Sequence, residues 1–104
     1  MEVKELSEKI KAFRAERGWQ TEGAQRDIAI SIAIEAGELL EHFQWWDAKE
    51  SCKRNFQGIK EELADVLIYG FTMAAMMNVD VEDIIAEKLE INKIKYPDPE
   101  QKAM

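Results

Sequence analysis

Two pairs of acidic side chains stand inside the most apolar stretches of the chain. Glu35 and Glu38 are three residues apart, and so are Glu62 and Asp65. If both stretches are helical, each pair shares one helix face. Acids on neighbouring faces could hold a metal ion that binds phosphates, so hydrolysis of a phosphoanhydride is a chemistry open to these residues. A solvated pair of surface acids is the alternative reading.

Few basic side chains accompany these acids. Between residues 27 and 43 the only candidate cation is His42, and between residues 61 and 81 there is none. Unneutralised carboxylates about 5 Å apart repel by roughly 3 kcal/mol per pair at an effective dielectric constant of about 20. A divalent cation removes this repulsion, and all-oxygen ligands favour Mg²⁺, with Mn²⁺ as a substitute. The predicted metal ligands are Glu35, Glu38, Glu62 and Asp65.

The last apolar stripe of the chain turns polar toward its end. The stripe begins at Val81 and continues at helical spacing through Lys88, Asn92 and Lys95. These polar side chains could face a polar ligand. The lysines also suit the negative end of a helix dipole, and the two readings weigh equally.

Aromatic side chains are the third signal. Trp19, Trp45, Trp46 and Tyr69 could stack on a nucleobase, although a tryptophan in a small domain is more often part of the core or of an interface. Tyr69 lies one turn beyond Asp65 and therefore on the acid face. The single histidine, His42, reads as a helix-surface residue.

Four helical segments would position these side chains. Isoleucines alternate in the second segment, which could indicate a strand, but the pattern is long and contains no turn signal. Asp80 is expected to cap the last segment. The expected helices cover residues 3–17, 25–45, 56–77 and 81–96, with a loop at 46–55 and a flexible tail at 98–104.

These segments predict an all-α fold, a four-helix bundle in one domain at residues 1–97. Two of the helices are apolar on nearly all faces and should be buried on most sides. A small bundle cannot bury both, so we expect a homodimer or a homotetramer.

Composition excludes several classes of protein. The 104 residues carry a formal net charge of −7, which disfavours extended nucleic acid as a partner. The lone Cys52 cannot form an internal disulfide or a zinc cluster. Neither a membrane-spanning run nor a signal peptide is evident, so no membrane association is expected and the expected compartment is the cytoplasm.

The segments EAGELLEHFQWW, EELADVLIYGF and EKLEINKIKYP resemble the MazG-like nucleoside triphosphate pyrophosphohydrolases, especially the short single-domain branch that includes dCTP pyrophosphatase. The likeness covers about residues 13–97. It implies an all-α homo-oligomer that cleaves a nucleoside triphosphate between the α and β phosphates, in nucleotide-pool housekeeping. It implies magnesium ligands at the four acids. It implies substrate contacts at Trp19, Arg26, Trp45, Tyr69, Lys88, Asn92, Lys95 and Tyr96.

The sequence departs from the family pattern at two places that concern recognition of the nucleobase. Close relatives carry a His-x-Pro-basic stretch before the second helix, where this chain has Gly23, Ala24, Gln25 and Arg26. The histidine of dCTP-specific members is Ile10 here, so cytosine specificity is not implied. Two alternatives stay open: a non-catalytic helical interaction module, and a metal-dependent phosphohydrolase acting on another bond or another nucleotide-like substrate.

Overall fold

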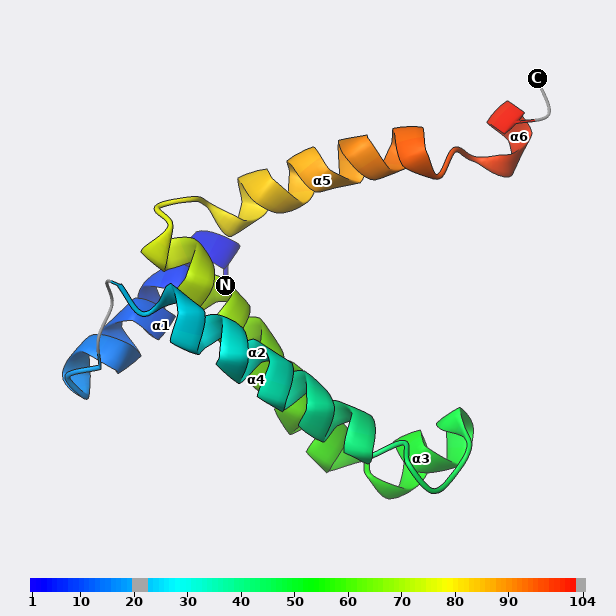
Figure 1. Ribbon diagram of the computed structural model, residues 1–104, viewed down its shortest axis with the longest axis horizontal. Helices are drawn as coiled ribbons and strands as arrows, with labels where there is room; N and C mark the ends of the chain where they lie inside the picture. Colours follow the sequence, from blue (N-terminus) through cyan, green and yellow to red (C-terminus); the bar gives the residue numbers. More distant parts are fainter. Residues whose placement is uncertain (20–22, 103–104) are drawn as a thin grey trace.

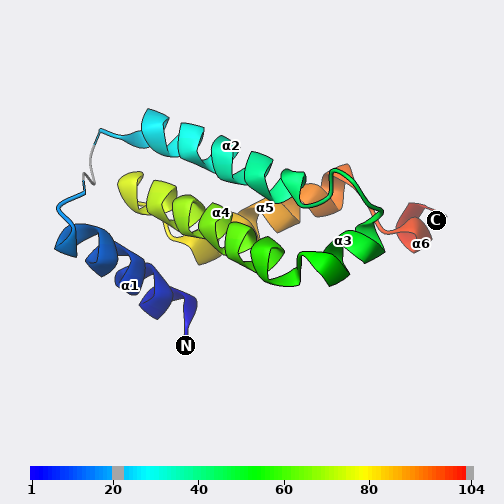
Figure 2. The same ribbon diagram turned by 90° about the horizontal axis from the view of Figure 1, so that it is seen from below.

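The computed structural model describes residues 1–19 and 23–102, with the side chains of 101 and 102 left out. Within these residues the chain is all-helical and contains no strand, as predicted. Figures 1 and 2 show the arrangement of its helices. They are α1 (Val3–Glu16), α2 (Gln25–Glu41), α3 (Ala48–Arg54), α4 (Phe56–Met76), α5 (Val81–Lys95) and α6 (Pro99–Lys102).

Helices α2 and α4 form an antiparallel pair, and both figures show them side by side along most of their length. The start of α2 packs near the end of α4. Ala24, which precedes α2, and Ile28 of α2 are buried there together with Thr72 and Ala74 of α4, whereas Ser51 is buried on α3. The Thr72 hydroxyl donates to the Ile68 carbonyl at 2.8 Å, which lets a polar side chain occupy this apolar place. Helix α2 carries Glu35 and Glu38, and helix α4 carries Glu62 and Asp65.

The connection between α2 and α4 corrects two expectations. Helix α2 ends at Glu41 rather than near residue 45, because the next amides bond three residues back and tighten the last turn. The expected loop at residues 46–55 contains α3. Asp47 caps this short helix, accepting from the Glu50 amide at 2.8 Å. The Asp-x-x-Glu spacing is a helix-start signal that the sequence interpretation passed over.

Helix α1 packs against α4 but stays largely exposed. Gly18 follows it with a φ of 67°, the left-handed conformation in which glycine commonly ends a helix. Its apolar stripe meets α4 only in part: Ile10 is half-buried, whereas Leu6 and Phe13 remain 41% and 46% exposed. The first helix therefore contributes little to a core within one chain.

Helix α5 leaves the rest of the molecule. Asn78 adopts a left-handed φ of 55° after α4, and Asp80 takes the N-cap position, although its side chain makes no capping hydrogen bond. The axis of α5 is bent by 101° from that of α4. Figure 1 shows α5 pointing away from the α2–α4 pair, so the described helices of one chain do not close into a four-helix bundle. The segment expected to be a flexible tail, residues 98–104, contains the short helix α6 in its described part. Its flexibility stays a prediction.

The isolated chain exposes far more surface than a compact protein of its size. Its accessible area is 8394 Å², whereas a folded monomer of 12.0 kDa exposes about 6,000 Å². Its radius of gyration is 17.1 Å, against about 13 Å for a compact domain of this length. The apolar faces of α2, α4 and α5 supply much of the excess. The helices that were expected to be buried on most sides are thus not buried by their own chain.

Among the described residues, no single helix is both long and apolar enough to span a membrane. Helices α4 and α5 would meet that test only as a joined pair with the 101° bend between them.

Candidate active site

The α2–α4 pair brings the predicted acids together. Glu35 lies on α2, and Glu62 and Asp65 lie on the facing side of α4. One carboxylate oxygen from each of these three residues lies within 4.8 Å of the other two. All three side chains are half-buried. The spacing of three within each helix and the antiparallel pairing of the helices together produce this cluster.

Glu38 lies beside this three-oxygen cluster rather than in it. It is half-buried one turn after Glu35, and it is close enough to raise the pKa of both Glu35 and Glu62. All four predicted acids are therefore electrostatically coupled. The structure places Glu38 at the edge of the cluster, where it can contact a bound ligand or a second cation.

The crowding of the acids raises the pKa of Glu35 to about 7. The first cause is a hydrogen bond with Glu62, followed by the loss of hydration and by the proximity of Glu38. The hydrogen bond with Glu35 lowers the pKa of Glu62, but lost hydration and Glu38 outweigh it, so the pKa of Glu62 is also raised. Without a cation, Glu35 therefore keeps its proton to a higher pH than a free glutamate does.

Two oxygens of the cluster lack partners. Glu35 Oε2 and Glu62 Oε2 are shielded from solvent and accept no hydrogen bond from the described residues. No ion pair formed within residues 1–19 and 23–100 reaches any of the four acids. Buried carboxylate oxygens are normally satisfied, and a hard divalent cation would satisfy these. The donor set fits Mg²⁺ or Mn²⁺ and offers no nitrogen or sulfur ligand for zinc or copper.

We expect the metal-free protein to lose stability as the pH rises. Glu35 ionises near 4.5 when unfolded and near 7 when folded, so the folded state binds more protons between these values. The free energy of unfolding therefore falls from about pH 4.5 to 7 and does not recover above that range. Added Mg²⁺ should raise the melting temperature most at pH 8, where it meets no competing proton.

Thermal unfolding at pH 5, 6, 7 and 8, with chelator and with Mg²⁺, measures this effect. Glu35→Gln is the control, because removing the titrating group should flatten the pH dependence of the metal-free protein. A melting temperature that rises over this range, with the same slope in wild type and Glu35→Gln, would refute the coupling of the acids.

The predicted aromatic residues lie at differing distances from the acid cluster along the chain. Tyr69 is half-buried on α4, one turn beyond Asp65. Trp19 follows α1 and packs edge-to-face on Phe13, with ring centroids 5.7 Å apart. Trp45 lies in the turn after α2 and is 75% exposed. Of the three rings, only that of Tyr69 shares a helix with an acid pair.

The remaining predicted substrate residues do not meet the acids within one chain. Arg26 lies at the exposed start of α2, two turns and more before Glu35. The others belong to α5 or its end, which turns away from the α2–α4 pair (Figure 1). These are Lys88, Asn92, Lys95 and Tyr96.

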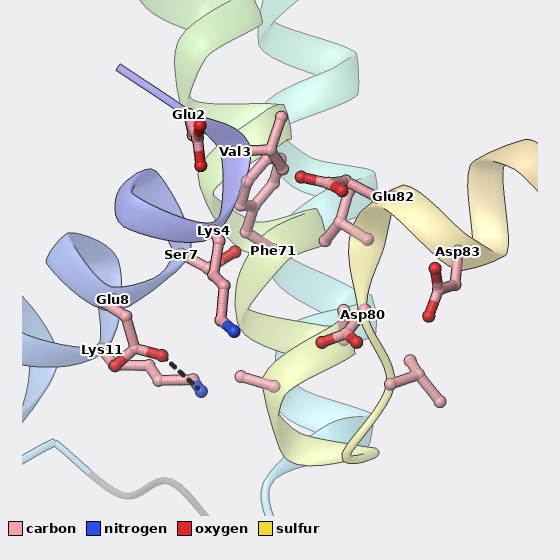
Figure 3. A pocket seen from close by; sticks show the side chains of 14 residues that line it. Glu2, Val3, Lys4, Ser7, Glu8, Lys11, Phe71, Asp80, Glu82 and Asp83 are labelled. Atoms are coloured by element: carbon pink, nitrogen blue, oxygen red, sulfur yellow. Dashed lines mark hydrogen bonds and ion pairs between the residues drawn. The ribbon is translucent and has the colours of Figure 1, made fainter.

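Two hollows lie elsewhere, beside α1 and α4. One of about 300 Å³ opens at the junction of α4 and α5, where Figure 3 shows Lys4 of α1 and the carboxylates of Asp80 and Glu82 around the same space. A second, of about 290 Å³, is lined partly by Ile10 and Phe71. None of the predicted site residues lines either hollow, so the candidate site is an open face of the helix pair.

Fold and site together define a helical protein with a cluster of carboxylates between two antiparallel helices. The MazG-like family matches residues 30–104, which include all four acids. The chain belongs to the MazG-like family.

Individual relatives agree with this assignment. The chain is 36% identical over 90 residues to dCTP pyrophosphatase 1 of Rattus norvegicus and 35% identical over 95 residues to that of Homo sapiens. Each match covers 82% of this chain but 53% of the relative, so the chain spans about half the length of these curated relatives. A crystal structure of a pyrophosphatase from Archaeoglobus fulgidus superposes with a TM-score of 0.82 at 35% identity. That superposition covers 91% of this chain and 92% of the other.

Proposed function

We propose that this protein is a magnesium-dependent pyrophosphohydrolase that converts a nucleoside triphosphate to the monophosphate and pyrophosphate. The observation that carries the proposal is the cluster of three carboxylate oxygens within 4.8 Å of one another, contributed by Glu35, Glu62 and Asp65. Two of these glutamates hold shielded oxygens without a hydrogen-bond partner. Membership of the MazG-like family, and relatives named as pyrophosphatases, support the same activity.

Glu35, Glu62 and Asp65 would hold the cation, with Glu38 at the edge of the site. A bound Mg²⁺ supplies charge neutralisation for the phosphates and polarises the phosphorus that is attacked. The protein's own residues keep the helix pair open on one face, so that an extended triphosphate can reach the carboxylates. In the reaction, water oxygen bonds to the α phosphorus and the bond to the bridging oxygen breaks. Pyrophosphate leaves with the electron pair, and the proton of the water passes to a carboxylate or to solvent.

The site needs more positive charge than one chain brings to it. Lys88 and Asn92 suit phosphate and sugar oxygens, but α5 carries them away from the acids. The described part of the chain contains no ion pair to Lys88 or Lys95. We propose that a second copy lays its α5 against the α2–α4 pair, so that a homodimer or a homotetramer completes the site. The surplus of roughly 2,400 Å² of exposed surface, relative to a compact monomer, is enough for such an interface.

The nucleobase would be held by aromatic side chains at the edges of the helix pair. Tyr69 is suited to this role one turn beyond Asp65, Trp45 is exposed, and Trp19 is about half exposed while it contacts Phe13 and Arg14. The relatives' name specifies dCTP, but Ile10 and the stretch from Gly23 to Arg26 differ from the pattern expected of dCTP-specific members. We propose a (d)NTP substrate acted on in the cytoplasm, without assigning its base.

A substrate panel tests the proposal. Each of the common NTPs and dNTPs is incubated with the protein and Mg²⁺, and the nucleotides are separated by anion-exchange chromatography. We expect at least one triphosphate to be converted to its monophosphate, with no diphosphate accumulating. Absence of turnover, together with no heat of Mg²⁺ binding by calorimetry, would favour the non-catalytic interaction module instead.

A further inference from the structure

A glycine of α4, Gly58, faces the ring of His42, the residue that follows α2. A Cβ atom built on Gly58 would lie 2.5 Å from His42 Cε1 and 3.0 Å from His42 Nε2. No real Cβ tolerates the shorter distance, so the imidazole occupies space that only glycine leaves open. The sequence interpretation placed His42 on the helix surface, but the structure shows it half-buried between the helices.

This contact lies on the same seam as the acids. His42 is four residues after Glu38, and Gly58 is four residues before Glu62. The outer acids, Glu35 and Asp65, lie seven residues from His42 and Gly58 respectively. Separations of four and seven keep residues on one helix face, and four residues advance a helix by about 6 Å. The ring and the glycine therefore sit one turn from the nearest acid on each helix.

The backbone beneath the imidazole is also fixed. Asn55, which precedes α4, donates from Nδ2 to the His42 carbonyl at 2.9 Å. This bond joins the end of α2 to the start of α4 across residues that are 13 apart in the chain. The backbone of His42 is therefore held beside the start of α4, and the ring can move away from Gly58 only by rotating about its own side-chain bonds.

We propose that the His42–Gly58 contact is a positioning device that sets the spacing of α2 and α4, and thereby the affinity of the carboxylate cluster for its cation. The inference rests on the metal site of the proposed function. Mg²⁺ requires near-ideal geometry with oxygens at about 2.0–2.1 Å, so a shift of a few tenths of an ångström between the helices weakens binding. The ring acts on the acids through the helix spacing and does not touch the ligand.

Gly58→Ala is the decisive variant. The added methyl group must push the imidazole or the helix away, and we expect the affinity for Mg²⁺ to fall about tenfold, as for other residues that orient metal ligands. Alanine has a higher helix propensity than glycine, so the substitution should not weaken the helix itself. A loss of Mg²⁺ affinity could therefore not be explained by a less stable helix. Adding His42→Leu should restore affinity, because leucine ends one bond short of the two ring atoms that clash.

Isothermal titration of the full chain with Mg²⁺ measures the affinity, and circular dichroism checks the helix content. Gly70→Ala is the matched control, since Gly70 lies on the same helix with no atom within 4 Å of its added Cβ. If Gly58→Ala does not fold, His42→Ala carries the test, because it removes the ring without adding an atom. We expect His42→Ala to bind Mg²⁺ more weakly than the wild type as well.

The outcomes separate this inference from the proposed function. Wild type that binds Mg²⁺ and hydrolyses a triphosphate, with Gly58→Ala binding equally well, would overturn the inference and leave the function standing. Failure of the second substitution to restore binding in Gly58→Ala would also overturn it. A wild-type protein that neither binds Mg²⁺ nor hydrolyses a triphosphate would overturn both the inference and the proposed function.

Discussion

Asp65→Asn should reduce turnover by about a hundredfold or more while making the metal-free protein more stable. The substitution preserves volume but removes one negative charge from the cluster. A lost ligand weakens the metal site at least as much as a lost supporting residue, for which tenfold to hundredfold losses are typical. The charge of Asp65 also helps to raise the pKa of both Glu35 and Glu62, so its removal relieves repulsion when no cation is present.

Initial rates at saturating Mg²⁺ and melting temperatures in chelator test the two halves of this prediction. Glu61→Gln is the matched control, because it removes the same charge from the neighbouring turn of α4 at an exposed position. We expect this control to change neither quantity appreciably. An Asp65→Asn variant with more than a tenth of the wild-type rate, or with lower metal-free stability, would contradict the assignment of Asp65.

Replacing two apolar residues of α5 by acids should dissociate the assembly and abolish turnover. Ile85 and Leu89 lie one turn apart on the same face of α5 and are 54% and 56% exposed in the single chain, so Ile85→Glu/Leu89→Glu costs the isolated fold little. If α5 is buried against a second copy, two unpaired charges would be placed in an apolar interface, at a cost of several kcal/mol. The site would then also lose Lys88 and Asn92 of the other copy.

Light scattering with size-exclusion chromatography measures the mass, and the rate assay measures turnover. The double substitution Lys49→Gln/Lys53→Gln on α3 lowers the net charge by the same amount at exposed positions and should leave the mass unchanged. A monomeric wild type with full activity would contradict the proposed composite site. So would an α5 variant that keeps both its mass and its rate.

The sequence allowed the acid cluster to be predicted because its signal is local. A spacing of three fixes a shared helix face for Glu35 with Glu38, and for Glu62 with Asp65, whatever the tertiary packing. The scarcity of cations between residues 27 and 43 could also be read directly. That these two faces meet follows from a short connection between two apolar helices, which favours antiparallel pairing.

Other features depend on distances that no local pattern contains. The role of Gly58 becomes visible only when the His42 ring is seen against it. Helix α3 had a local signal in Asp47 and Glu50, but its polar residues were typical of a loop. The direction of α5 could not be predicted, because most of its apolar residues remain exposed in the described part of its own chain.

The stability of the metal-free chain is limited by the same features that suit it to bind a cation. Clustered acids with shielded oxygens, and apolar helices left exposed, both oppose a stable isolated monomer. Binding of Mg²⁺ would relieve the repulsion between the acids, and binding of a second copy would bury the exposed apolar helices. Both would stabilise the folded chain, so each should favour the other.

Phosphorus-31 NMR of a single reaction tests the central claim most directly. A triphosphate selected from the substrate panel is incubated with the protein and Mg²⁺, first alone and then with excess chelator. We predict equal amounts of nucleoside monophosphate and pyrophosphate, and no reaction after chelation. Signals of nucleoside diphosphate and inorganic phosphate, or hydrolysis that persists in chelator, would contradict a magnesium-dependent cleavage between the α and β phosphates.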